Sequence, residues 1–201
     1  MRPQSAWLRM FWIVTRWLHI YLSLFGFATI LFFSVTGLTL NHPTWFGGVH
    51  ETTERFEGMV DLAWVAGSEG TPDWLRLAEH FRATHRLQGV VGEVRDDGDE
   101  LSLEFAGPAY AADVLVRRED GQYTGTITRH GAVALINDLH KGRDTGGGWS
   151  VVIDLSALLM GISAITGLVL LYSIKRKRLT GTVVAVAGTV ALWLAYRWLV
   201  P

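Results

Sequence analysis

Three long apolar runs stand out along this chain. The first extends from Trp17 to Leu40 without a charged residue, and as a helix it would be ~36 Å long, enough to cross the ~30 Å hydrocarbon core of a bilayer. The second, Val151 to Ile174, carries only Asp154, and a weaker third run extends from Val183 to about Leu199. The pattern therefore predicts three transmembrane helices. A cleaved signal peptide is the alternative for the N-terminus, but the first run is far longer than a ~7–15-residue signal core.

The segment between the first two runs has the periodicities of a helix and of strands. Apolar positions recur at helical spacing behind a Thr71 cap and before Gly89, namely Trp74, Leu75, Ala78, Phe81 and His85. Alternating runs predict two hairpins, Val90 to Arg95 with Leu101 to Phe105 and Asp113 to Arg118 with Tyr123 to Thr128. A helix on a small antiparallel sheet, an α+β module, is expected. Residues 43–70 and 129–148 are interpreted as connectors near the membrane surface, and the second of them ends in a Gly146–Gly148 hinge beside an interfacial Trp149.

The charges are segregated along the chain and predict its orientation. The cations that flank the first two runs are Arg2, Arg9, Arg16, Lys175, Arg176, Lys177 and Arg178. The positive-inside rule places both groups in the cytoplasm, so the segment between the runs lies outside. That segment holds 18 of the 19 acidic residues against 10 Lys and Arg, a local net charge of about −8 within an overall −1. An inner-membrane anchor with an acidic periplasmic module is expected.

The predicted layout has five parts. They are residues 1–41 (cytoplasmic N-terminus and first transmembrane helix), 42–148 (periplasmic module with connectors), 149–174 (second helix), 175–182 (basic cytoplasmic loop) and 183–201 (third helix). The chain has no cysteine, which excludes disulfides, covalent c-type haem, thiolate iron–sulfur clusters and thiol catalysis. No G-x-G-x-x-G or P-loop pattern is present, and a redox centre would need non-covalent ligands such as histidine.

The small and polar residues of the first two runs lie on particular helix faces. In the first run most of them lie on one stripe, which follows steps of three and four residues through His19, Ser23, Gly26, Ile30, Phe33, Gly37 and Asn41. The second run has two rows, Ala157, Gly161 and Ala164, and Ser156, Ser163 and Gly167. Such faces allow a helix or a flat ligand to approach closely. The phrase Thr-Gly-Leu occurs in both runs, at Thr36 and at Thr166, and gives weak support for packing.

Several ordered phrases resemble the PepSY-associated transmembrane family. They are Leu135-Ile136-Asn137-Asp138-Leu139-His140-Lys141-Gly142-Arg143, Trp149, Asp154-Leu155-Ser156-Ala157, Thr166-Gly167-Leu168, and, near the start, Arg16-Trp17-Leu18-His19, Thr36-Gly37-Leu38 and Asn41-His42-Pro43. The resemblance spans residues ~9–178 and implies a PepSY-like helix-plus-sheet module between the helices. Larger members resemble bacterial inner-membrane ferric-siderophore reductases, which hold b-type haems among their helices and carry electrons across the membrane. This chain is shorter, with three predicted spans where the larger members have at least four.

The resemblance makes haem b, one or two per chain, the expected cofactor. His42 and His140 both lie at the outer membrane boundary and are the candidate ligands of one haem iron. His19 lies ~35 Å along the helix from His42, so it needs a site of its own. That site is a five-coordinate haem or a haem shared by a homodimer; otherwise His19 is an interfacial imidazole snorkelling beside Arg16. Helix ending at His42 and loop capping at His140 are the structural alternatives.

Further residues are expected to support the site or to stand apart from it. Gly37 and Gly161 would leave room for the macrocycle, and Asp154 would pair with Arg143, bond an imidazole, or only favour its helix N-terminus. His50, His80, His85 and His130 are expected to be solvated or packed in the module.

Three functions fit the sequence. The first is a haem-b redox protein that transfers electrons to a ferric chelate or a periplasmic redox partner and contributes to iron uptake; a ferric-chelate reductase or an electron-transfer subunit would fit. The second is a non-redox membrane anchor whose module binds or restrains a periplasmic protein. The third is a metal-handling accessory that uses His42, His50 and His140. Membrane lipid is an expected partner in each case, a homodimer accompanies a shared haem, and nucleic acid is not expected.

Overall fold

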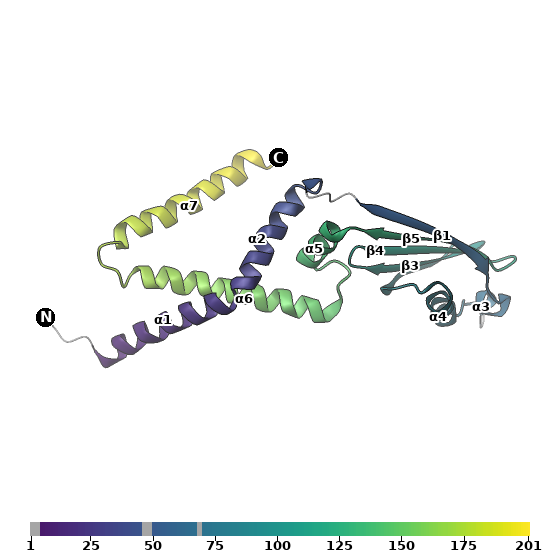
Figure 1. Cartoon of the computed structure of the whole chain (residues 1–201), viewed down its shortest axis with the longest axis horizontal. Coiled ribbons are helices and arrows are strands. Elements are labelled where there is room, and N and C mark those ends of the chain that lie inside the picture. Colours follow the sequence, from purple (N-terminus) through teal and green to yellow (C-terminus); the bar gives the residue numbers. More distant parts are fainter. Residues whose placement is uncertain (1–4, 46–49, 68–69) are drawn as a thin grey trace. The chain divides into compact units, whose positions relative to one another are not determined.

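The computed structural model describes residues 5–45, 50–67 and 70–201, and Figure 1 shows the elements along the chain. The chain divides into two compact units. The helical unit comprises the chain up to Leu31 and from Asp154 onward, and the module unit comprises Phe32–Ile153. Arg2, one of the cations of the predicted cytoplasmic end, lies outside the described residues.

Long apolar helices make up the helical unit and continue into the module unit, which holds most of α2 and the start of α6. α6 (Gly146–Leu171) and α7 (Arg178–Leu199) are each long and apolar enough to cross a membrane. The first apolar run forms two helices, α1 (Ala6–Phe25) and α2 (Phe27–Asn41), which are bent by 54° at their junction. The described residues therefore provide two candidate membrane spans, or three if the bent pair forms one span.

The bend lies at Gly26 and corrects the expectation of one uninterrupted helix from Trp17 to Leu40. Glycine is a poor helix former because it lacks a Cβ that restricts the backbone. Hydroxyl groups on both sides also bond helix carbonyls: Ser23 Oγ donates to Ile20 O at 3.2 Å, and Thr29 Oγ1 donates to Gly26 O at 2.7 Å. Such back-bonding bends helices, so glycine and hydroxyls together account for the bend.

A five-stranded antiparallel sheet forms the centre of the module unit. The strands are β1 (Glu51–Met59), β2 (Val90–Asp96), β3 (Glu100–Gly107), β4 (Tyr110–Arg117) and β5 (Gln122–His130). Their order is β1-β5-β4-β3-β2, and every neighbouring pair is antiparallel. Both predicted hairpins are confirmed, as β2–β3 and β4–β5.

Residues 43–70 are predicted from the sequence to be a connector, but this prediction is wrong for residues 51–59, which form strand β1. The strand is mostly polar and exposed, and only Phe56 and Gly58 are partly buried. Their cross-strand partners are Gly125 and Tyr123. A Cβ on Gly125 would lie 2.2 Å from the Phe56 ring, and one on Gly58 would lie 2.4 Å from Tyr123 Oη. Each glycine thus leaves the space that an aromatic ring of the neighbouring strand occupies.

Helix α4 (Trp74–His85) covers one face of this sheet, after the short α3 (Leu62–Ala66). Asp73 caps α4 by accepting a hydrogen bond from the Arg76 N–H at 3.1 Å, so the cap is two residues beyond the predicted Thr71. Leu77 and Phe81 are fully buried against the sheet. The strand residues of this core are Leu101, Leu103, Phe105, Ala112, Val114, Val116, Tyr123 and Ile127.

The second predicted connector, residues 129–148, contains helix α5 (Ala132–Lys141). It ends at Gly142, whose φ of 69° is the left-handed conformation that glycine tolerates. Helix α6 begins at Gly146, so the predicted glycine hinge forms the first turn of a helix. Trp149 Nε1 donates a hydrogen bond to Leu139 O at 2.7 Å, which ties the start of α6 to α5.

Candidate functional site

His140 lies in the last turn of α5 and is held by Thr36 of α2. Thr36 Oγ1 lies 2.5 Å from His140 Nδ1, and Thr36 also donates a hydrogen bond to Phe32 O at 2.7 Å. A hydroxyl has one proton, so Thr36 must accept from an Nδ1–H of His140. This network assigns the tautomer in which the lone pair is on Nε2.

A second contact fixes α5 to α2 one turn away. Thr39 Oγ1 donates to Asn137 Oδ1 at 2.6 Å, and both threonines of α2 are buried, with exposed fractions of 1% and 3%. Thr36 and Thr39 are three residues apart on α2, as are Asn137 and His140 on α5, so the two pairs match in helical spacing. The edge of Phe33 packs on the His140 ring, with centroids 5.0 Å apart. His140 therefore has one fixed orientation.

His19 of α1 makes an equivalent contact with α6 inside the helical unit. Its Nδ1 lies 3.1 Å from Ser163 O and 3.1 Å from Thr166 Oγ1. A carbonyl oxygen only accepts, so Nδ1 carries the proton and Nε2 again keeps its lone pair. Thr166 donates its own proton to Ile162 O at 2.7 Å. The imidazole bonds α6, and this contact contradicts the alternative in which it snorkels beside Arg16.

The two Thr-Gly-Leu phrases now have a common role, because the threonine of each binds a histidine. Gly167 adds space for the ring: a Cβ there would lie 2.9 Å from His19 Cε1. The sequence alone does not predict that Thr36 and Thr166 contact histidines, although the repeated phrase is a signal for it. At Gly37 and Gly161 an added Cβ would meet nothing within 4 Å among the described residues, so the faces predicted for close approach are open there.

His42 follows the end of α2 and has different neighbours. Asn41 Nδ2 lies 3.3 Å from His42 Nε2, and an amide nitrogen only donates, so Nε2 is the acceptor. The ring stacks on Trp45 with centroids 3.8 Å apart and an interplanar angle of 6°. The described contacts of His42 and His140 thus involve separate residues, and joint iron ligation by this pair stays a prediction.

The remaining predicted residues divide between surface and module core. Arg143 and Asp154 are exposed, and their pairing stays a prediction. His85 stacks on Phe56 and its Nε2 lies 2.8 Å from Tyr123 Oη. Burial, and then the nearby His80, lower the pKa of His85, while burial raises the pKa of Tyr123. His80 and His85 therefore contribute to module packing, as expected.

No group of three or more metal-ligating side chains occurs among residues 5–45, 50–67 and 70–201. His42, His50 and His140 all belong to those residues, so they do not form the cluster that a metal-handling accessory needs. One buried polar atom of the helical unit is also unpaired within the described chain, Ser163 Oγ, on the helix that binds His19.

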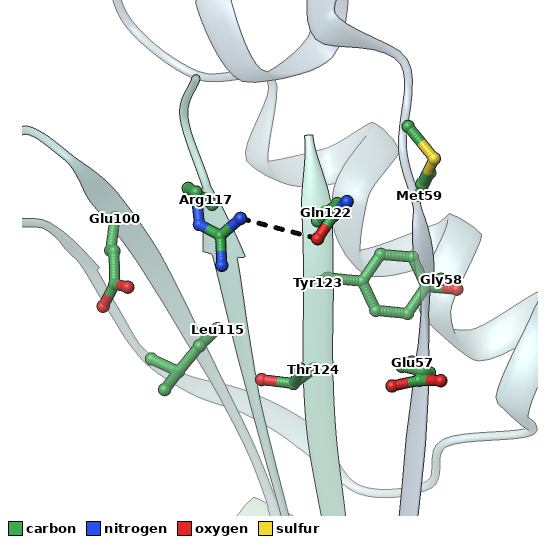
Figure 2. A pocket seen from close by; sticks show the side chains of 9 residues that line it. All are labelled: Glu57, Gly58, Met59, Glu100, Leu115, Arg117, Gln122, Tyr123 and Thr124. Carbon is green, nitrogen blue, oxygen red and sulfur yellow. Dashed lines mark hydrogen bonds between the residues drawn. The ribbon is translucent and has the colours of Figure 1, made fainter. Parts of the chain in front are cut away.

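The module unit has an open hollow of about 340 Å³ on the sheet (Figure 2). Its walls come from β1, β3, β4 and β5, and Arg117 bonds Gln122 across it at 3.4 Å. Figure 2 shows the Tyr123 ring extending from β5 toward Gly58. Met59 and Leu115, which line the hollow, are exposed, with fractions of 66% and 48%. Glu57 and Glu100 also line the hollow, so acidic and apolar side chains share this surface.

Apolar helices that can cross a membrane, with an antiparallel sheet and its covering helix between them in sequence, define a membrane protein with an inserted α+β module. The chain matches the family model PepSY_TM_like_2, described as PepSY_TM-like, over residues 13–201. It therefore belongs to this PepSY-associated transmembrane family, and the resemblance seen in the sequence is confirmed. No curated protein and no solved structure matches the chain.

Proposed function

We propose that this protein is a haem-b-binding redox protein of the bacterial inner membrane that transfers electrons to an extracytoplasmic acceptor. The supporting observation is the shared arrangement of His19 and His140, in which Nδ1–H is bonded to a protein oxygen and Nε2 has no hydrogen-bond partner among the described residues. Histidines that ligate metals commonly donate their other N–H to such an oxygen, which fixes the ring and the tautomer. His19 lies in the helical unit and His140 in the module unit. One haem at either histidine, or one at each, would give one or two haems per chain.

The residues around each imidazole support this function. Thr36 and Thr166 orient the rings, and Gly167 leaves room for one of them. When bound, haem supplies a one-electron carrier whose potential its surroundings tune. His140 is the proposed first ligand of the outer haem and His42 the second, after His42 gives up its contact with Asn41. A ferric chelate or a periplasmic redox protein is the proposed acceptor class, by analogy with the larger reductases.

The acceptor is extracytoplasmic because the positive-inside rule orients three transmembrane helices with the module outside. A reporter that is active only in the periplasm should be active when fused at Gly98 and silent when fused after Arg178. The reverse pattern would place the module and His140 in the cytoplasm and overturn this orientation.

An absorption spectrum with pyridine haemochrome quantification of the detergent-purified chain tests the cofactor. A Soret band with reducible α and β bands is expected. His140→Ala and His19→Ala should each remove one centre or make it high-spin, and His42→Ala should change the outer centre alone. His50→Ala is the control, because His50 is exposed immediately before β1. A His140→Ala protein with unchanged haem content, spin state and potential would contradict the proposed outer site.

The alternative, a non-redox anchor whose module binds a periplasmic protein, rests on the hollow of Figure 2. Met59 and Leu115 are exposed there beside Glu57 and Glu100, which suits a partner with apolar and basic side chains. A colourless, folded protein whose binding of such a partner is lost in Leu115→Asp would favour this function. Haem in the same sample would favour electron transfer instead.

A further inference from the structure

Helix α1 presents a stripe of basic and apolar side chains to the turn between α6 and α7. Arg9, Trp12, Ile13 and Arg16 are spaced by three and four residues and therefore lie on one helix face. Together with Ser173, Lys175 and Arg178 they line a hollow of about 350 Å³, which we call the basic hollow. All seven residues belong to the helical unit, and the hollow is separate from the contacts of His19.

Within the part of the chain that the structure describes, the four cations of the basic hollow have no acidic partner. Among the described residues none of them forms an ion pair, and Asp154 is the only acidic residue of the helical unit. Asp154 is also roughly 26 Å along α6 from Leu171, at 1.5 Å per residue. Like charges that converge without a counterion repel each other, and the repulsion is strongest beside a low-dielectric membrane. The basic hollow therefore favours an anion.

The surroundings of the basic hollow indicate which anion it binds. Its walls continue into the exposed apolar surfaces of α1 and α7, on which Met10, Ile13, Val183 and Val186 are all more than half exposed. Trp12 lies between the two arginines, and tryptophan is common at the level of lipid headgroups. Arginine binds phosphate through two parallel hydrogen bonds. A ligand with a phosphate group and acyl chains matches both surfaces.

We propose that the basic hollow binds the phosphate group of an anionic phospholipid, with the acyl chains against α1 and α7. The arginines of α1 and Arg178 provide hydrogen bonds to the phosphate oxygens, and Lys175 provides a further positive charge. This site is independent of haem binding. The bound lipid would connect α1 with the turn between α6 and α7, because both contact the same headgroup.

Titration of the detergent-purified full chain with short-chain phosphatidylglycerol, followed by thermal unfolding, measures this binding. Phosphatidylglycerol should stabilise the protein, and phosphatidylcholine of the same chain length should not. Arg16→Gln should weaken the apparent affinity about fivefold, which corresponds to about 1 kcal/mol for one cation. Arg16→Gln with Arg178→Gln should weaken it roughly 25-fold, whereas Arg16→Lys should restore most of it.

Arg197→Gln is the matched control, because Arg197 lies in the last turn of α7 and does not line the basic hollow. This variant should bind phosphatidylglycerol like the wild type. Equal losses in Arg16→Gln and Arg197→Gln would mean that only net charge matters and would overturn the site. Inorganic phosphate is tested alone in the same detergent. If it stabilises the protein and phosphatidylglycerol adds nothing, a free phosphate is the ligand and the lipid assignment fails.

Discussion

The core around the sheet and the apolar helices bury opposite kinds of side chains. Around the sheet the buried set is apolar and includes Leu77, Phe81 and Phe105, whereas the buried hydroxyls of the module unit, Thr36 and Thr39, belong to α2. In the helical unit the buried side chains are hydroxyls, Thr15, Ser156, Ser163 and Thr166, while most of the large apolar side chains are exposed. Each unit therefore matches a different solvent. In water, burial of apolar side chains in the module core is favourable. In lipid, apolar side chains gain little from burial, so the polar groups of the helices bond one another instead.

This contrast shows where specificity lies in each unit. In the module, packing of the apolar core determines the fold, and the polar exceptions sit at its margin, as His85 and Tyr123 do. In the helices, the few polar side chains determine which faces meet, because they are the groups that lipid cannot satisfy. Both histidine–threonine pairs, His19 with Thr166 and His140 with Thr36, involve residues of the apolar helices.

The largest expected effect is the loss of a core side chain. Phe81 is fully buried in the module, so Phe81→Ala should reduce the free energy of unfolding of the module by about 3–5 kcal/mol. Leu158→Ala in α6 is the control. Leu158 is 59% exposed, so its truncation should reduce the free energy of unfolding only slightly. Denaturant unfolding of the full chain, followed by circular dichroism, compares the two. Similar losses at both positions would show that the helical unit has an apolar core of its own.

A buried hydroxyl of the helices should matter next. Thr166→Val keeps the shape but removes the oxygen that accepts from His19, so haem affinity at that imidazole should fall about 10–100-fold. Thr189→Val is the matched control, because Thr189 bonds only Ala185 O of its own helix among the described residues. Nitrogen-15 shifts of the His19 ring provide a readout without haem: they should show Nδ1–H in the wild type. A wild-type tautomer bearing Nε2–H would contradict the proposed network.

A smaller effect is expected from a single methyl group beside the same ring. Gly167→Ala places a Cβ 2.9 Å from His19 Cε1, so the imidazole must shift, at a cost of about 1 kcal/mol. Gly161→Ala should be silent in the isolated chain because nothing lies within 4 Å of the new Cβ. The optical spectrum of the proposed haem centre at His19 measures the shift. Suppose instead that Gly161→Ala changes the spectrum or the oligomeric state and Gly167→Ala does not. The cofactor or a second helix would then bind at the face of Gly161.

The sequence predicts the module better than the helices, for a physical reason. In β3, β4 and β5 alternate residues are buried, so the period-two alternation records the fold, and both hairpins are confirmed although β2 has only Val91 partly buried. Strand β1 has only Phe56 and Gly58 on that face, so its pattern carries too little signal. In the apolar runs, hydrophobicity is uniform and says nothing of the bend at Gly26. His19 and His140 are recognisable as candidates, but their partners lie more than 100 positions away in sequence.

The smallest expected effect is a pH dependence confined to the module. Burial, and then His80, lower the pKa of His85 in the folded state, where its ring stacks on Phe56 and bonds Tyr123. The unfolded chain has a histidine pKa of about 6.5, so it binds the proton first as the pH falls. The stability from neutral His85 is therefore complete above about pH 6.5 and is lost as the pH falls through the lower folded-state value. The melting temperature of the module should fall between about pH 7 and pH 5.5, His85→Gln should reduce the slope, and His50→Gln should keep it. An unchanged slope in His85→Gln would assign the proton uptake to another group.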